Sequence, residues 1–169
     1  MCGLGRVERG RMRPRGRATA VRAPETTLRE FLEVWHALRH ESSEPGAVVV
    51  VEGERDRSSL RRLGISGSIV LVHRGVTLSA TAHALSDRRR HVIVLTDWDR
   101  EGGHLAQRLR GFLEADGLRL DLDHRRRLAT VLRGEVVHVE GLAGWARRLA
   151  DKVRIPLEEL LPGAEDGSD

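Results

Sequence analysis

The sequence predicts an α/β protein with a parallel or mostly parallel sheet and helices on both faces of that sheet. Short β-branched runs alternate along the chain with segments whose apolar residues recur at helical spacing. The runs at 47–51 and 92–95 are apolar at every position, which is typical of strands buried on both faces. A chain of 169 residues is long enough for one domain with appendages.

The expected elements follow in chain order. A helix begins near Thr27, where Thr27 and Glu30 have the spacing of a capping box, and ends near Glu41. Strands are expected over 47–51, 68–72 and 91–96, and the alternating leucines at 118–122 indicate a half-exposed edge strand. The helices that connect and follow these strands are expected to end at Gly64 and to span 78–85, 102–115, 125–132 and 142–153.

Charge and composition divide the chain into five parts. Seven arginines and one glutamate give residues 1–24 a net charge of +6, which leaves −2 for the other 145 residues because the whole chain carries +4. We therefore expect a basic flexible arm at 1–24, a helix and link at 25–46, an α/β core at 47–124, a helical extension at 125–161 and a loose tail at 162–169. The arm is either a lead-in to the fold or a segment that neutralises nucleic-acid phosphates.

Composition excludes several classes of protein. A single cysteine, Cys2, rules out an internal disulfide framework and any zinc site built on several cysteines. The histidines show no paired metal-ligand spacing except His36 and His40, which we interpret as surface residues of the first helix. No apolar run approaches the roughly 18 residues of a membrane span, and the N-terminal segment has no apolar secretory region. We expect a cytoplasmic protein that does not bind membranes.

Acidic residues follow two of the buried strands directly. The first strand continues into Glu52 and Gly53, and the third continues into Asp97, Asp99 and Glu101 before a pair of glycines. In parallel sheets chemistry takes place beyond the carboxyl ends of the strands. If the two strands are neighbours, these carboxylates meet at one edge of the sheet.

Several carboxylates in one place repel one another unless a cation neutralises them. Because the set contains no cysteine or histidine, it suits a hard divalent ion, and we expect Mg²⁺ with Mn²⁺ as a substitute. Gly53 and Gly102 let the backbone approach a phosphate, and the helix that begins near Gly102 adds free N–H donors for an anion.

These motifs carry a family resemblance. The segments Val-Glu-Gly-x-x-Asp and Asp-x-Asp-Arg-Glu-Gly, between about 47 and 124, resemble the Toprim domain. That domain is shared by topoisomerases, bacterial primases, several nucleases, RecR-type repair proteins and the ribonuclease that matures 5S ribosomal RNA. The chain looks most similar to small stand-alone archaeal Toprim proteins.

The resemblance implies roles for the acids and their neighbours. It makes Glu52 the catalytic general acid or base and a metal ligand, with Asp97 and Asp99 as ligands for two ions and Glu101 as a further acid. The supporting residues that it implies, in the second shell or against phosphate, are Asp56, Gly53, Arg74, Gly75, Arg100 and Gly102.

The resemblance, together with the catalytic residues and motifs that the chain lacks, favours a metal-dependent nuclease. Without tyrosine the chain cannot form the covalent phosphotyrosine of a topoisomerase, and it has no phosphate-binding loop of an ATPase. We expect a ribonuclease-like endonuclease that acts on structured RNA rather than DNA, because aromatic residues that could stack on bases are scarce. It could work with a ribosomal or processing-complex protein.

The alternative is a non-catalytic nucleic-acid binder or an accessory subunit of a processing complex. The basic arm favours this hypothesis, and so does the apolar face of the last long helix, where Leu142, Trp145 and Leu149 could dock a partner or pack in the core.

Overall fold

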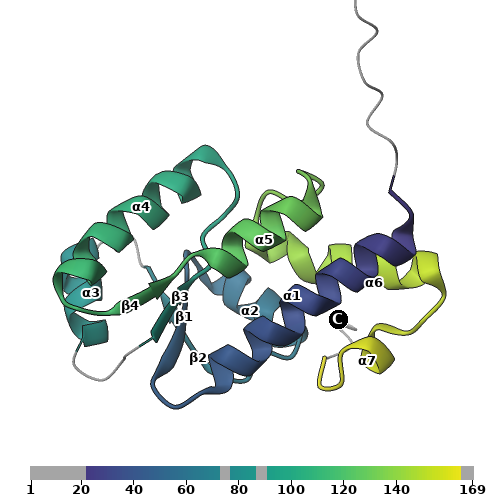
Figure 1. The fold of residues 1–169 in the computed structure, drawn as a ribbon, viewed down its shortest axis with the longest axis horizontal. Helices are drawn as coiled ribbons and strands as arrows, with labels where there is room; N and C mark the ends of the chain where they lie inside the picture. The colour runs from purple at the N-terminus through teal and green to yellow at the C-terminus, as the bar shows by residue number, and fades with distance from the viewer. Residues whose placement is uncertain (1–21, 73–76, 87–90, 165–169) are drawn as a thin grey trace, which may run out of the picture.

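The computed structural model describes residues 22–72, 77–86 and 91–164 (Figure 1). Most of the expected basic arm, the end of the expected tail and the predicted phosphate-contacting residues Arg74 and Gly75 lie outside these ranges. In the part of the chain that is described, no helix is both long and apolar enough to cross a membrane.

The four strands form one parallel sheet in the order β2-β1-β3-β4. They are β1 (Ala47–Val51), β2 (Ser68–Leu71), β3 (His91–Val94) and β4 (Arg119–Asp121). In register, Val50 of β1 lies beside Val70 of β2 and Val94 of β3. The expected α/β class is confirmed, with the last strand at an edge of the sheet.

Alternation along the strands decides which helices cover which face (Figure 1). Val48, Val50, Val92 and Val94 point toward α3 (Leu78–Ser86) and α4 (Arg100–Ala115). Val49, Val51, Ile93 and Leu95 pack on the opposite side in a larger core. The helices of that side are α1 (Pro24–Ser43), α2 (Glu54–Arg62), α5 (Asp123–Leu132), α6 (Leu142–Val153) and α7 (Leu157–Leu160).

The first helix begins earlier than the sequence pattern predicts. It starts at Pro24, whose fixed backbone angle suits the first helical position, and Ala23 is its N-cap. Thr27 lies one turn inside the helix and donates its hydroxyl to the carbonyl of Ala23, so the predicted capping box with Glu30 does not form.

Two short elements near the C-terminus have no counterpart in the sequence prediction. A 3₁₀ turn, η1 (Val139–Gly141), comes just before α6, and α7 packs against the larger core through Leu157. In α6 itself, Leu142 is fully buried and Trp145 and Leu149 are 4% and 6% exposed. These residues belong to the core, so this face of α6 is not a docking surface.

Candidate functional site

The acidic ends of β1 and β3 meet at the carboxyl edge of the sheet. Glu52 comes directly after β1, and Asp97 comes three residues after the end of β3. Because β1 and β3 are adjacent and parallel, both residues lie at the same end of the sheet. The backbone N–H of Asp97 donates to Glu52 Oε1 at 2.9 Å. The structure therefore joins the two motifs that the sequence keeps 45 residues apart.

Asp97 is held from the other side by the segment before α6. Its Oδ1 accepts a hydrogen bond from the backbone N–H of Val139 at 2.8 Å, and its Oδ2 lies 2.8 Å from His138 Nδ1. One ligand atom each from Asp97, Asp99 and His138 lies within 4.8 Å of the other two, and neither Glu52 nor Glu101 belongs to this group.

Sequence reasoning missed His138. It lies 41 residues after Asp97, in a segment with no histidine or carboxylate spacing typical of a metal site. Its hydrogen bond to Asp97 raises the pKa of the imidazole, and the charges of Asp97, Asp99 and Glu140 add to that rise against a smaller effect of burial. The imidazole thus takes up a proton more readily beside Asp97, which is the more enclosed of the two carboxylates in the group.

The start of α4 fixes Asp99. This residue is the N-cap of the helix, and its Oδ1 accepts the backbone N–H of Gly102 at 2.7 Å. A Cβ on Gly102 would lie 2.2 Å from the carbonyl oxygen of Asp97, so only glycine allows this close approach. The N–H of Gly102 is therefore engaged within the protein, where the sequence analysis expected it to face a phosphate.

The loop after β1 is closed by a hydrogen bond from its backbone to a side chain of α2. Gly53 donates its N–H to Asp56 Oδ2 at 2.9 Å, and Asp56 is only 6% exposed. Burial raises the pKa of Asp56, with a smaller rise from Asp97 and an opposing effect of the Gly53 hydrogen bond. Asp56 therefore holds the loop that carries Glu52 to the edge of the sheet.

Burial also raises the pKa of Glu52. The hydrogen bond from the Asp97 backbone opposes this effect, and the negative charges of Asp97, Asp56 and Asp99 add to it. A raised pKa makes this carboxylate a stronger base than an ordinary glutamate, which suits a group that has to accept a proton.

Arg125, at the start of α5, is a second residue that sequence reasoning missed. Its Nε donates to the carbonyl of Thr96 at 3.0 Å, and a terminal nitrogen donates to the carbonyl of Asp97. Burial lowers the pKa of this guanidinium, while Glu52, Asp99 and Asp97 act in the opposite direction. It braces the backbone that carries the two aspartates and offsets part of their charge.

A cleft of about 920 Å³ opens beside these residues. Glu52, Asp97 and His138 line it together with the exposed Glu101, and Arg55, Arg108 and Phe112 contribute to its walls. Arg100, another predicted phosphate contact, is exposed but is not among the lining residues.

The donor atoms of this edge suit a hard divalent ion. In each of Glu52 and Asp99 one carboxylate oxygen takes a backbone donor, and within the described ranges no hydrogen bond reaches the other oxygen, Glu52 Oε2 or Asp99 Oδ2. Oxygen donors of this kind are those that Mg²⁺ and Mn²⁺ prefer, and a cation would relieve the repulsion that raises the pKa of Glu52. Asp97, Asp99 and Glu52 would hold it, with His138 adjacent.

The fold and this edge define a class of protein: a parallel α/β domain with a carboxylate site for divalent metal beyond its strands. A family model for the Toprim domain matches residues 47–131. The chain therefore belongs to the Toprim family, whose domains bind divalent metals and act on nucleic acid.

The chain is also similar to archaeal proteins and to one solved structure. The chain is 37% identical over 109 residues to a UPF0292 protein of Methanosarcina barkeri, and the aligned region covers 64% of this chain and 76% of that protein. It is 32% identical over 131 residues to a UPF0292 protein of Pyrococcus abyssi, covering 78% and 98% of the two chains. Among solved structures, a protein from Aquifex aeolicus aligns with a TM-score of 0.49 and 21% identity, covering 71% of this chain and 98% of that one.

Proposed function

We propose that this protein is a Mg²⁺-dependent endonuclease that cleaves phosphodiester bonds in structured RNA, with two ions at the carboxyl edge of the sheet. The observation that carries the proposal is the hydrogen-bonded junction of Glu52 and Asp97 beside the Asp97–Asp99–His138 group. Family membership supports metal-dependent chemistry on nucleic acid.

Each residue has a task that follows from its surroundings. When bound, divalent ions supply charge stabilisation to the phosphate that reacts. Glu52 transfers a proton through its carboxylate, whose pKa burial raises. Arg125 holds the backbone of Thr96 and Asp97 in place.

The cleft is lined by more carboxylates than arginines, so it is suited to a polyanion with a folded shape only when cations are bound to its acids. Arg55 is 87% exposed at its side chain and lies in the wall of the cleft, where it can reach backbone phosphates. Phe112 is the single exposed large aromatic side chain among the described residues, so stacking on a series of unpaired bases has little support. Recognition of shape and backbone therefore favours structured RNA as the substrate.

The proposal is tested by metal titration and cleavage on the same samples. Mg²⁺ and Mn²⁺ are titrated calorimetrically into the wild type and Asp97→Asn, and structured RNA and duplex DNA are then assayed on gels. Asparagine keeps an oxygen for the Val139 N–H but removes the charge, so we expect metal binding and cleavage to be lost together. Asp116→Asn, at the exposed end of α4, is the matched control.

Three results would contradict the proposal in different ways. If the protein cleaves duplex DNA but not structured RNA, the proposed substrate is wrong. Metal binding without cleavage of either nucleic acid would favour an accessory subunit that lends its site to a partner. Cleavage that survives Asp97→Asn would remove this edge of the sheet from the reaction.

A further inference from the structure

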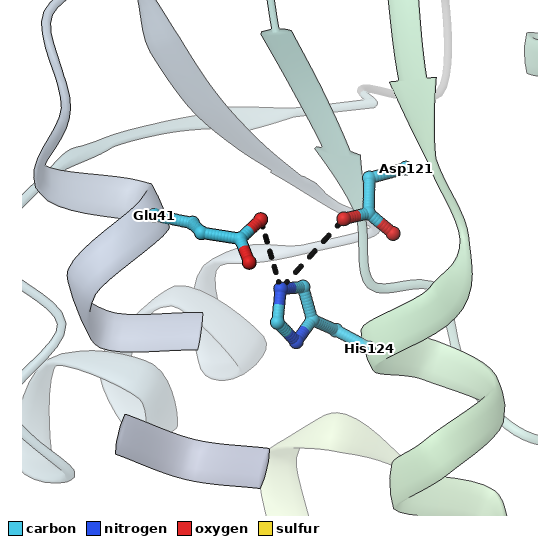
Figure 2. A group of neighbouring side chains, drawn as sticks. All are labelled: Glu41, Asp121 and His124. Atoms are coloured by element: carbon cyan, nitrogen blue, oxygen red, sulfur yellow. Dashed lines mark ion pairs between the residues drawn. The ribbon is translucent and has the colours of Figure 1, made fainter. Parts of the chain in front are cut away.

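A second cluster of histidine and carboxylate side chains lies where the end of α1 meets β4 and the start of α5. Figure 2 shows Glu41, Asp121 and His124 converging from these three elements. His124 Nε2 is 3.2 Å from Glu41 Oε2 and 3.7 Å from Asp121 Oδ2. One ligand atom from each residue lies within 4.8 Å of the other two.

His91, the first residue of β3, faces the same two carboxylates. Its Nε2 lies 3.7 Å from Asp121 Oδ2 and 4.0 Å from Glu41 Oε2. This nitrogen is buried and has no hydrogen-bond partner in the structure. A buried nitrogen that points at two carboxylates without bonding either of them is a costly arrangement unless something else binds it.

The cluster is separate from the Toprim edge, the carboxyl end of the sheet that carries Glu52, Asp97 and Asp99. His91 and Asp97 are six residues apart on one extended segment, which corresponds to about 20 Å. Of the cluster, His91 opens β3, whereas α5 begins nearer the carboxyl edge, where Arg125, the residue after His124, reaches the carbonyls of Thr96 and Asp97. No residue of the cluster lines that cleft.

The charges of the cluster are not balanced by a basic side chain. Among the described residues, no arginine or lysine pairs with Glu41 or Asp121, whose side chains are 37% and 14% exposed. His124 is 3% exposed, and its buried Nδ1 has no hydrogen-bond partner. Two carboxylates that are mostly buried without a basic partner are a costly arrangement, which a bound cation would relieve.

We propose that Glu41, Asp121, His124 and His91 bind a zinc ion. Neutral imidazole nitrogens favour Zn²⁺ over Mg²⁺, and carboxylate oxygens complete zinc sites. Zinc bonds of about 2.1 Å in a tetrahedron put ligand atoms about 3.4 Å apart. The four nitrogen–oxygen distances in this cluster range from 3.2 to 4.0 Å, close to that spacing. Glu41, Asp121 and His124 form the group whose ligand atoms all lie within 4.8 Å of one another, and His91 is outside it, so His91 must move toward the ion to become the fourth ligand.

The ion would join the end of α1 to β3 and to the β4–α5 turn. These segments are distant in sequence, and the ion would therefore stabilise the packing of the N-terminal helix on the sheet. It takes no part in the phosphodiester chemistry, so the site can exist whether or not the protein is a nuclease.

The test is zinc binding to the full-length protein stripped of metal, with excess Mg²⁺ present to occupy the Toprim edge. Zn²⁺ is added in competition with a chromophoric chelator, and thermal unfolding is followed on the same samples. We expect one zinc per chain and a rise in the unfolding midpoint. Glu41→Gln and His91→Gln should each weaken zinc binding at least about tenfold and reduce the rise.

Two variants serve as controls. Glu44→Gln changes an exposed carboxylate one turn from Glu41 that faces only His40, and it should bind zinc as the wild type does. Asp97→Asn should also retain zinc, because the proposed ion is not at the Toprim edge. X-ray absorption of the zinc-loaded wild type should show imidazole ligands together with oxygen, a result that needs no variant to fold.

The proposal is overturned if the Mg²⁺-saturated protein takes up no zinc, since the cluster is then an ion-pair network without metal. It is equally overturned if Glu41→Gln and His91→Gln bind zinc as tightly as the wild type. Zinc that is lost in Asp97→Asn but kept in Glu41→Gln would place the ion at the Toprim edge instead.

Discussion

Two histidine–carboxylate clusters lie at opposite ends of the segment that runs from His91 to Asp97. At the carboxyl end, His138 is 50% exposed at its side chain, and Asp97 and Asp99 each accept a backbone N–H at the mouth of a cleft. At the other end, His124 is 3% exposed and bridges carboxylates from two elements. The same residue types thus face a ligand cleft in one place and the packing between α1 and the sheet in the other.

Both clusters use backbone donors, because Asp121 Oδ1 accepts the N–H of Asp123 at 2.5 Å, but they differ in what the remaining oxygens face. Backbone N–H groups hold the acids of the cleft in position, and within the described residues no hydrogen bond reaches Glu52 Oε2 or Asp99 Oδ2. In the buried cluster, Glu41 faces only the imidazoles of His91 and His124 among the described residues. Our two proposals assign an exchangeable ion and a substrate to the first arrangement and a permanent metal link to the second.

The largest expected effect is the loss of cleavage when the cluster at the carboxyl end is changed. Asp97→Asn should lower metal-dependent cleavage of structured RNA by at least about 100-fold, because it removes the charge that binds the ion. Cleavage is measured as single-turnover rates on gels. Asp116→Asn should cleave at the wild-type rate, and an equal loss in that control would mean that charge on α4 in general, rather than this site, is responsible.

The second prediction tests the packing that supports the cleft. Gly102→Ala places a Cβ 2.2 Å from the carbonyl of Asp97 and should lower the free energy of unfolding by about 3 kcal/mol. Gly111→Ala, on the same helix with no atom within 4 Å of the added Cβ, should raise it by about 0.5–1 kcal/mol. Urea titration measures both, and a Gly102→Ala protein as stable as wild type would contradict the close approach.

The third prediction concerns the exposed histidine. His138→Asn removes the imidazole beside Asp97 and Asp99 but leaves the backbone bond from Val139, so Mn²⁺ affinity should fall about tenfold with the fold intact. Calorimetric titration of Mn²⁺ measures this, and His104→Asn, on the exposed side of α4, is the matched control. Unchanged affinity would show that His138 neither binds the ion nor orients Asp97 for it.

The smallest expected effect is a gain in stability at neutral pH. Because the pKa of Glu52 is raised in the folded protein, its ionised form opposes folding above the ordinary value of 4.5, and the penalty is absent below it. Glu52→Gln should therefore raise the unfolding midpoint of the metal-free protein by about 2 °C at pH 7.5, with the gain vanishing near pH 4. Calorimetry across this range checks the sign, and a constant gain at all pH values would exclude ionisation as its cause.

Much of the architecture could be predicted from the sequence because it depends on local patterns. The run of valines at 47–51 is apolar at every position, so it can only be buried on both faces, and it forms β1 with those bounds. The start of α1 was missed because a proline before the predicted cap takes the first helical position. The η1 turn and α7 were missed because three or four residues are too few to show a period.

The sequence by itself determined which carboxylates follow the buried strands, and the parallel arrangement then requires Glu52 and Asp97 to share an edge. Only the tertiary structure brought His138 and Arg125 to that edge, and Glu41, His91, Asp121 and His124 to one point. The physical reason is that strand periodicity is encoded in neighbouring residues, whereas these contacts join segments whose relative positions depend on how helices pack on the sheet. No spacing in the chain could reveal them.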